Sequence, residues 1–160
     1  MWRDDQPISE PRRTSGGEDP GIRQDRGVPR LVPLPRVDDD RGSLSFIEAG
    51  DDVPFQIRRV YYVTGVPAGA QRGGHAHANN ERLIVAVAGS VRITVDNGII
   101  RVTYALDRSD LGLYIPSLTW CELHDFSATA VCLVLSSQHY DASDYISDYD
   151  EFVSKVRRCR

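Results

Sequence analysis

Hydrophobic and β-branched residues recur along this sequence in short runs that turn residues separate. Val91 to Val95 alternates with a period of two, as a half-buried strand does. The Asp96-Asn97-Gly98 segment after it predicts a tight hairpin, because Asn-Gly readily adopts positive φ values. No helical period interrupts these runs, so the pattern predicts an all-β sandwich or barrel. Its strands are expected at residues 44–47, 58–64, 82–88, 91–95, 99–106, 113–115, 120–123 and 130–135.

The C-terminal end is the one segment with a helical period. Phe152, Val153 and Val156 share one face of a predicted helix over residues 148–157. Ser147 is the expected N-cap of this helix, because its hydroxyl can accept a hydrogen bond from a free backbone N–H of the first turn.

Residues 1–30 differ in composition from the rest of the chain. They carry four prolines, a Gly16-Gly17 pair and charges of both signs, with almost no aliphatic side chains. Such a segment buries too little apolar surface to offset the entropy lost on ordering. We therefore predict a disordered N-terminal tail over residues 1–30 and a single folded domain over residues 31–160.

Composition and charge limit the classes of function. The 160 residues are 41% hydrophobic, which suits one domain with a hydrophobic core. The net charge is −4. The charge argues against a nucleic-acid partner, which calls for a clustered basic surface. No apolar run approaches a membrane span or a secretory signal. Three cysteines at no zinc-like spacing indicate reduced thiols and a cytoplasmic protein: Cys121, Cys132 and Cys159.

Candidate chemistry centres on Gly74-His75-Ala76-His77. Residues two apart in a strand point to the same face, so His75 and His77 project together, and Glu81 joins them if the strand stays regular. Paired imidazoles serve either as metal ligands or as a general acid/base pair. The residues alone leave both open, and Cys121 is a further possible ligand.

Arginine is unusually frequent beside the predicted strands. Of the 19 basic residues, Lys155 is the one lysine. Arginine suits bidentate recognition of phosphate, but the sequence does not say which guanidinium groups point inward. The arginines in or beside strands are Arg36, Arg41, Arg58, Arg59, Arg72 and Arg82.

Two sets of motifs carry a family resemblance. Gly69, His75, His77, Glu81 and Gly89 resemble the first cupin motif, with one gap a residue off. More specifically, residues 31–153 resemble the sugar 3,4-ketoisomerases that act on dTDP-4-keto-6-deoxyhexoses, the WxcM-like cupins. The matching segments are Asp40-Arg41-Gly42-Ser43-Leu44, Arg59-Val60-Tyr61-Tyr62, His75-Ala76-His77, Gly112-Leu113-Tyr114-Ile115, Trp120-x-Glu122 and Asp144-Tyr145-Ile146.

The resemblance implies a cupin-type jelly-roll β-barrel and a homodimer in which strands are exchanged between subunits. It implies an isomerase, an intramolecular oxidoreductase interconverting keto and hydroxy groups, that moves the ketone of a dTDP-linked sugar from C4 to C3. Neither a metal nor a cofactor is implied, because the substrate carries its own electron sink. The catalytic residues would be His75 as general base, His77 as proton relay and Arg41 as an electrostatic stabiliser.

The resemblance also implies substrate-binding residues, namely Arg59, Tyr61, Tyr62, Arg72 and Cys121. Cys121 is a departure, because family members often have His or Arg directly after the matching tryptophan. Two other functions remain as alternatives: a metal-dependent cupin oxygenase that uses His75, His77 and Glu81, and a non-catalytic sugar-nucleotide-binding module.

Overall fold

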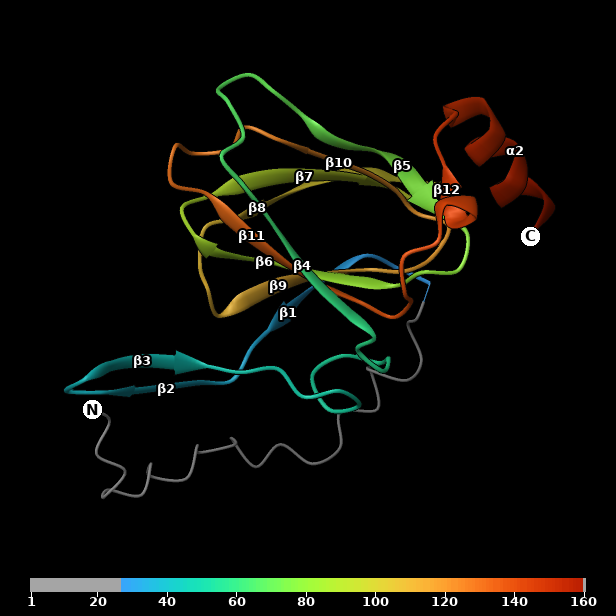
Figure 1. The fold of residues 1–160 in the computed structure, drawn as a ribbon. Helices are drawn as coiled ribbons and strands as arrows, with labels where there is room; N and C mark the ends of the chain where they lie inside the picture. The colour runs from blue at the N-terminus through green and yellow to red at the C-terminus, as the bar shows by residue number, and fades with distance from the viewer. Residues whose placement is uncertain (1–26, 160) are drawn as a thin grey trace.

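The structure is a computed structural model that describes residues 27–159, and its body is a pair of five-stranded sheets (Figure 1). Sheet I has the order β1 (Arg30–Pro33), β9 (Leu111–Ile115), β6 (Arg82–Ala88), β11 (Val131–Ser136) and β4 (Arg59–Thr64). Sheet II has the order β12 (Tyr145–Ile146), β5 (Arg72–His77), β10 (Trp120–His124), β7 (Val91–Asp96) and β8 (Arg101–Leu106). All neighbouring strands within the two sheets are antiparallel.

The two sheets face one another and enclose the main hydrophobic core. Ile84 and Val134 of sheet I pack in the same cluster as Ile93, Cys121 and Leu123 of sheet II. This arrangement confirms the predicted all-β jelly roll, and the C-terminal helix α2 (Tyr149–Arg158) confirms the one predicted helix. The space between the sheets is the inside of the molecule.

The outer faces of the sheets are covered by two other parts of the chain. On sheet I, Leu83 and Val85 pack against Val53 and Phe55 from the segment between β3 and β4. This explains the apolar run of β6, which is buried on both faces over residues 82–86. On sheet II, α2 covers a smaller cluster built from Ala76, Trp120, Ile146, Phe152 and Val156.

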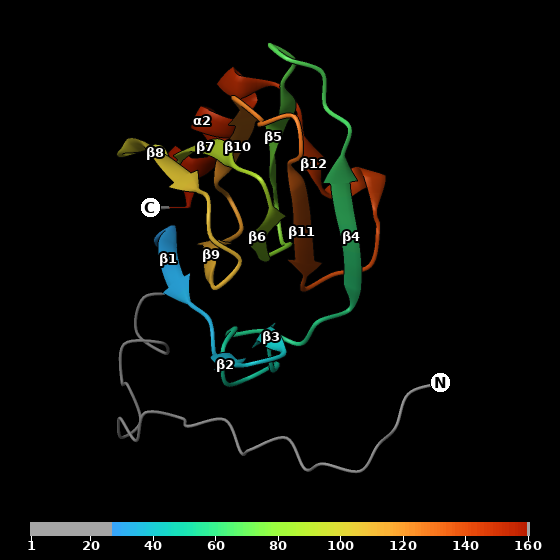
Figure 2. The same cartoon turned by 90° about the vertical axis from the view of Figure 1, so that its left-hand side faces the viewer.

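A two-stranded hairpin, β2 (Arg36–Asp39) paired with β3 (Gly42–Ser45), joins neither sheet. Figures 1 and 2 both show it below the two sheets and clear of them. Arg41 lies at its turn, where the guanidinium pairs with Asp39. The hairpin is therefore an arm that extends from the body of the chain.

Two local expectations were wrong in detail. Asp96 pairs with Arg101, so β7 and β8 are joined by a four-residue loop over residues 97–100 rather than a two-residue Asn-Gly turn. The Asp96 carboxylate accepts from the backbone N–H of Gly98, and the Asn97 side-chain oxygen accepts from that of Ile99, which favours the longer loop.

The N-cap of α2 is Asp148 and not Ser147. The Asp148 carboxylate accepts from the Glu151 backbone N–H at 2.8 Å. An aspartate is at least as good a cap as serine and also adds a negative charge at the positive end of the helix dipole.

Residues 1–26, most of the predicted tail, lie outside the described residues, and β1 begins at Arg30. Among residues 27–159, no helix has the length and apolar composition that a membrane span requires.

Candidate active site

The histidine pair lies on β5, and the local backbone aims both rings to the inside of the molecule. His75 is the direct cross-strand partner of Cys121, which belongs to the core between the sheets. Ala76 faces the opposite way, into the cluster under α2. The register of β5 and β10 shifts just beyond this point, where Gly73 has a φ of 84° and a Cβ atom would overlap the Cys121 carbonyl oxygen. The glycine therefore allows the close approach that sets His75 opposite Cys121.

Three aromatic rings meet at the end of β5. The centroids of the His75 and His77 rings are 5.0 Å apart, at an interplanar angle of 89°. Tyr145, the cross-strand partner of His77 on β12, lies 4.8 Å from the His75 ring and 4.4 Å from the His77 ring. The period of two therefore holds, and the two imidazoles share one inner face with a phenol packed against both rings.

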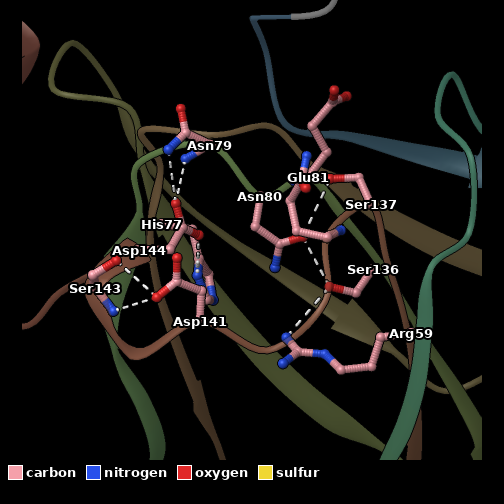
Figure 3. Close-up of polar contacts among 11 residues, drawn as sticks. Arg59, His77, Asn79, Asn80, Glu81, Ser136, Ser137, Asp141, Ser143 and Asp144 are labelled. Carbon is pink, nitrogen blue, oxygen red and sulfur yellow. Dashed lines mark hydrogen bonds and ion pairs between the residues drawn. The ribbon is translucent and has the colours of Figure 1, made fainter.

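Asp144 holds one side of the His77 ring. Its carboxylate lies 2.9 Å from His77 Nδ1, and it also accepts from the backbone N–H of Asn79 at 2.7 Å (Figure 3). Asp144 ends the short 3-10 helix η1 (Ala142–Asp144) and is buried. Because a carboxylate only accepts hydrogen bonds, Nδ1 of His77 carries the proton and Nε2 has a free lone pair.

Both imidazoles are neutral near pH 7. Burial is the main cause and the positive charge of Arg82 the second, and together they lower the pKa of His75 from 6.5 to about 4. The pKa of His77 is lowered by the same two causes and by His75, although Asp144 opposes the shift. Neutral imidazoles at this place are able to accept protons, which is the state that a general base needs.

Two arginines on sheet I face the same interior. Arg59 on β4 and Arg82 on β6 are both cross-strand partners of Ser136 on β11, so the three side chains form one row on the inner face. Arg59 Nη2 donates to Ser136 Oγ at 3.4 Å. Its guanidinium also lies over two phenol rings, 5.1 Å from the Tyr61 centroid and 5.6 Å from the Tyr140 centroid.

Unsatisfied polar atoms gather in this row. Within residues 27–159, the buried side-chain nitrogens without a hydrogen-bond partner belong to four residues, Arg59, His77, Asn80 and Arg82. Asn80 is tied to the same place, because its Oδ1 accepts from Ser136 Oγ at 2.8 Å (Figure 3). Buried polar groups in folded proteins are nearly always hydrogen-bonded. The cluster thus has several donors and acceptors whose hydrogen-bonding capacity is not used within the described residues.

The structure does not bring every predicted site residue to this cluster. Tyr62 lies on the opposite face of β4 from Tyr61 and is 70% exposed. Arg72 is exposed at the start of β5, and Arg41 lies on the β2–β3 arm. Cys121 and Tyr61, by contrast, face the interior as expected.

Glu81 does not join the histidines. The strand β5 ends at His77, and the chain turns before β6 begins at Arg82, so the period of two does not reach residue 81. The Glu81 carboxylate instead accepts a hydrogen bond from the Tyr114 hydroxyl. Among residues 27–159, no three His, Cys, Asp or Glu side chains are grouped as a metal site would need. The ligand set of the oxygenase alternative is therefore not assembled in this chain.

Sequence reasoning missed Asp144 and Tyr145 beside the histidines and Asn80 and Ser136 beside the arginines, and it did not show that Arg82 points inward. Asp144 and Tyr145 lie in a tyrosine- and aspartate-rich segment to which composition assigns no chemistry. A charged residue at the start of an otherwise apolar strand was the available signal for Arg82.

Comparison with known proteins gives a consistent result. Residues 28–157 match the protein family described as FdtA: WxcM-like, C-terminal. The chain is 41% identical over 129 residues to the TDP-4-oxo-6-deoxy-alpha-D-glucose-3,4-oxoisomerase of Aneurinibacillus thermoaerophilus, which covers 81% of this chain and 93% of the relative.

Solved structures give the same match. The sugar 3,4-ketoisomerase QdtA of Thermoanaerobacterium thermosaccharolyticum, in complex with TDP, is 35% identical with a TM-score of 0.79, over 82% of this chain and 96% of QdtA. A substituted form of QdtA holds TDP-4-keto-6-deoxyglucose. The TDP-quinovose 3,4-ketoisomerase WlaRB of Campylobacter jejuni is 40% identical with a TM-score of 0.76, over 79% of this chain and 97% of WlaRB.

Proposed function

Since this chain belongs to the FdtA family of WxcM-like C-terminal domains, we propose that its substrate is a TDP-linked 4-keto-6-deoxy sugar, as the names of its relatives indicate. The protein is an isomerase, a sugar 3,4-ketoisomerase of deoxysugar biosynthesis. One observation carries the proposed site: two neutral imidazoles share an inner face with buried nitrogens that lack partners.

The reaction moves two hydrogens within one molecule. A base takes the proton from C3, which the neighbouring C4 ketone acidifies, and the electron pair of the C3–H bond forms an enediolate. A proton then returns to carbon at C4, while the hydroxyl proton passes from O3 to O4. The product has its ketone at C3 and a hydroxyl at C4, so atoms and electrons balance without an outside oxidant or reductant.

His75 is the proposed base for the carbon proton. Its imidazole is neutral and half-buried on the inner face, beside Tyr145 and His77. A neutral imidazole takes the C3 proton and, as imidazolium, returns it at C4.

His77 is the proposed relay between the two oxygens. With Nδ1 held by Asp144, Nε2 is buried and has no partner within the described residues. It is thus free to accept the O3 hydroxyl proton and deliver it to O4. Asp144 is the positioning residue, since it sets the tautomer and orientation of the ring without touching the sugar.

Arg59 is the proposed anchor for the diphosphate. Guanidinium groups suit phosphate oxygens, and Arg59 lies at the same end of sheet I as Arg82, braced by Ser136 and two phenol rings. Tyr61 and Cys121 face the same interior and are proposed to contact the sugar.

We propose that the protein is a homodimer and that its arm completes the site of the partner copy. The β2–β3 hairpin pairs with neither sheet, so its turn, which carries Arg41 and its partner Asp39, is able to reach outside its own chain. Apolar side chains along the arm and the sheet edge support such a contact, because Leu44 is 47%, Val60 55% and Tyr62 70% exposed. In this arrangement Arg41 would supply positive charge beside the partner's enediolate.

A cytoplasmic location is also proposed. Cys121, Cys132 and Cys159 are all free thiols, which suits a reducing compartment.

The function is tested by incubating the purified full chain with TDP-4-keto-6-deoxyglucose and following the sugar by NMR. The expected result is a 3-keto isomer, and in D2O deuterium should appear at the carbons that exchange protons. TDP should bind in calorimetry. Binding of TDP without turnover would support the sugar-nucleotide-binding module instead, and neither binding nor turnover would contradict both functions.

A further inference from the structure

Arg82 is the most deeply buried charge of the described chain that lacks an ionic partner. It is the first residue of β6 and is 3% exposed. Ile84 and Ala86, two and four residues along the same strand, pack in the core between the sheets, so Arg82 points to that same inside. Its guanidinium is close enough to lower the pKa of both His75 and His77.

Two nitrogens of this guanidinium, Nε and Nη2, have no hydrogen-bond partner within residues 27–159. They form one edge of the planar group, and their N–H bonds run parallel, as in the side-on recognition of two oxygens. Arg59 differs, because its Nη2 already donates to Ser136 and its face is covered by phenol rings. Arg82 thus has both N–H groups of one bidentate edge without a partner.

The neighbours of Arg82 do not neutralise its charge. No Asp or Glu of the described chain forms an ion pair with it. The groups within its hydrogen-bonding reach are the Tyr61 phenol and the Cys121 thiol. Burial raises the pKa of both, more than Arg82 lowers it, so both stay protonated and uncharged near pH 7.

A buried cation without a counter-charge is strongly unfavourable for a fold, and an apolar residue of the same size would be more stable. The charge is compensated when an anion enters. The reaction itself makes an anion at this place, because the enediolate forms beside the imidazoles that exchange its protons. Its two oxygens, O3 and O4, are cis to one another on the C3=C4 double bond and lie in its plane, so they match a bidentate edge.

We propose that Arg82 binds O3 and O4 of the sugar through Nε and Nη2 and stabilises the enediolate, so that it is a catalytic residue of the ketoisomerase. This rests on the proposed function. Arg82 also lies near enough to Cys121 to lower the pKa of its thiol, and Cys121 is the position at which the resembling enzymes often carry His or Arg. A cation from the neighbouring sheet thus occupies the place next to the thiol, and positive charge is present there without a basic residue at 121.

The test compares wild type, Arg82→Met, Arg82→Lys and the control Arg92→Met, which removes an exposed arginine of β7. Four quantities are measured: kcat, deuterium exchange at C3 in D2O, the Kd of TDP and the melting temperature without ligand. Arg82→Met should lower kcat and C3 exchange about 10²- to 10³-fold, the usual effect of removing one transition-state donor. The Kd of TDP should change less than about twofold, since the proposed contact is to the sugar.

The melting temperature of Arg82→Met should rise by about 2–4 °C or more, because the uncompensated charge is gone. Arg82→Lys keeps the charge but loses the bidentate edge, so its kcat should lie between those of wild type and Arg82→Met. Arg92→Met should match wild type in all four quantities. If Arg82 only stabilised the fold, Arg82→Met would lower the melting temperature instead.

Near-normal kcat in Arg82→Met would overturn the proposal. So would a loss of TDP affinity of about tenfold or more with kcat unchanged, which would assign Arg82 to the diphosphate. A lower melting temperature in both Arg82 variants would contradict the uncompensated charge. If wild type neither isomerised nor exchanged, the proposed function would fail, and the melting temperatures would still decide whether Arg82 is an uncompensated charge.

Discussion

His77 donates its Nδ1 proton to Asp144 across 2.9 Å, although 67 residues separate the two along the chain. The contact fixes which nitrogen of His77 faces the site, because the carboxylate holds one and leaves the other free. A second imidazole, His75, lies with its ring centroid 5.0 Å away and forms no ion pair with a carboxylate of residues 27–159. The pair is therefore asymmetric, and the two histidines are suited to different proton transfers.

Replacement of the proposed base should abolish most of the turnover. His75→Asn removes the proton acceptor but keeps a side chain of similar size and polarity, so kcat should fall at least about 10²-fold, as for the loss of a general base. The Kd of TDP, measured by calorimetry, should stay within about twofold, because His75 is proposed to contact the sugar and not the nucleotide. Turnover close to wild type would remove His75 from the mechanism.

Asp144→Asn should reverse the tautomer of His77. The Asn amide can still accept from the Asn79 N–H, but its NH2 group then faces Nδ1 and forces the proton onto Nε2. We expect kcat to fall roughly 10²- to 10⁴-fold. The 15N NMR spectrum should show the proton of His77 on Nε2 in the variant, where wild type carries it on Nδ1.

Asp141→Asn is the matched control for that change. Asp141 is exposed, three residues away, and its hydrogen bonds from Ser143 are ones that an Asn oxygen also accepts. This variant should behave as wild type. An unchanged His77 tautomer in Asp144→Asn would contradict the positioning role.

The pH profile should reflect the lowered pKa of the imidazoles. The groups that face His75 are Arg82, His77, Tyr145 and Cys121, of which Arg82 alone is charged near pH 7. The acid limb of kcat/KM should therefore lie near pH 4 rather than 6.5. Arg82→Met should move this limb upward, since the nearby positive charge is lost. An acid limb at 6.5 in wild type would show that His75 is not buried as described.

Stability should follow the same titration. Because the folded pKa of His75 is below 6.5, the unfolded chain binds more protons between pH 6.5 and about 4. Its contribution to the free energy of unfolding is thus fully present above pH 6.5 and is lost as the pH falls toward 4. Urea titrations at several pH values would measure this, and His75→Asn should show a smaller loss over the same range.

Mixed dimers should recover activity if Arg41 acts across the subunit boundary. The variants Arg41→Ala and His75→Ala should each be nearly inactive, but each mixed dimer would contain one site with both residues intact. With random assortment half of the dimers are mixed, so refolding an equal mixture should restore roughly a quarter of wild-type activity.

A control pairing keeps both changes on the same chain. A dimer in which every chain carries both Arg41→Ala and His75→Ala has no intact site and should stay inactive after the same refolding. Light scattering should give the mass of a dimer for all variants. No recovery in the mixed sample would place Arg41 in the site of its own chain or outside the site.

Thiol reactivity should separate the three cysteines. Cys121 and Cys132 are buried and burial raises the pKa of both thiols, whereas Cys159 is exposed at the end of α2. A disulfide reagent should therefore label one thiol of the native chain rapidly and three after unfolding. Cys159→Ser should leave none reactive in the native protein. Rapid native labelling of Cys121 would contradict its place in the core.

Much of the histidine site follows from local periodicity. Residues two apart in a strand share a face, which is enough to place His75 with His77 on one face of β5, and Cys121 with Leu123 on one face of β10. The same rule separates Tyr61 from Tyr62, which are neighbours in β4 and point to opposite sides. Composition and turn residues likewise sufficed for the all-β class and the C-terminal helix, because both depend on short-range patterns.

The tertiary structure determined the features of the site that local patterns do not predict. Glu81 leaves the histidine face because the chain turns after His77, and the length of a strand depends on its neighbours in the sheet. Arg82 becomes an inward, uncompensated charge through its register with Ser136, and Asp144 reaches His77 through the pairing of β12 with β5. The sequence by itself determined which side chains share a face of one strand. Only the packing of distant strands decided which faces meet, because hydrogen-bond register between strands is set by contacts far apart in the chain.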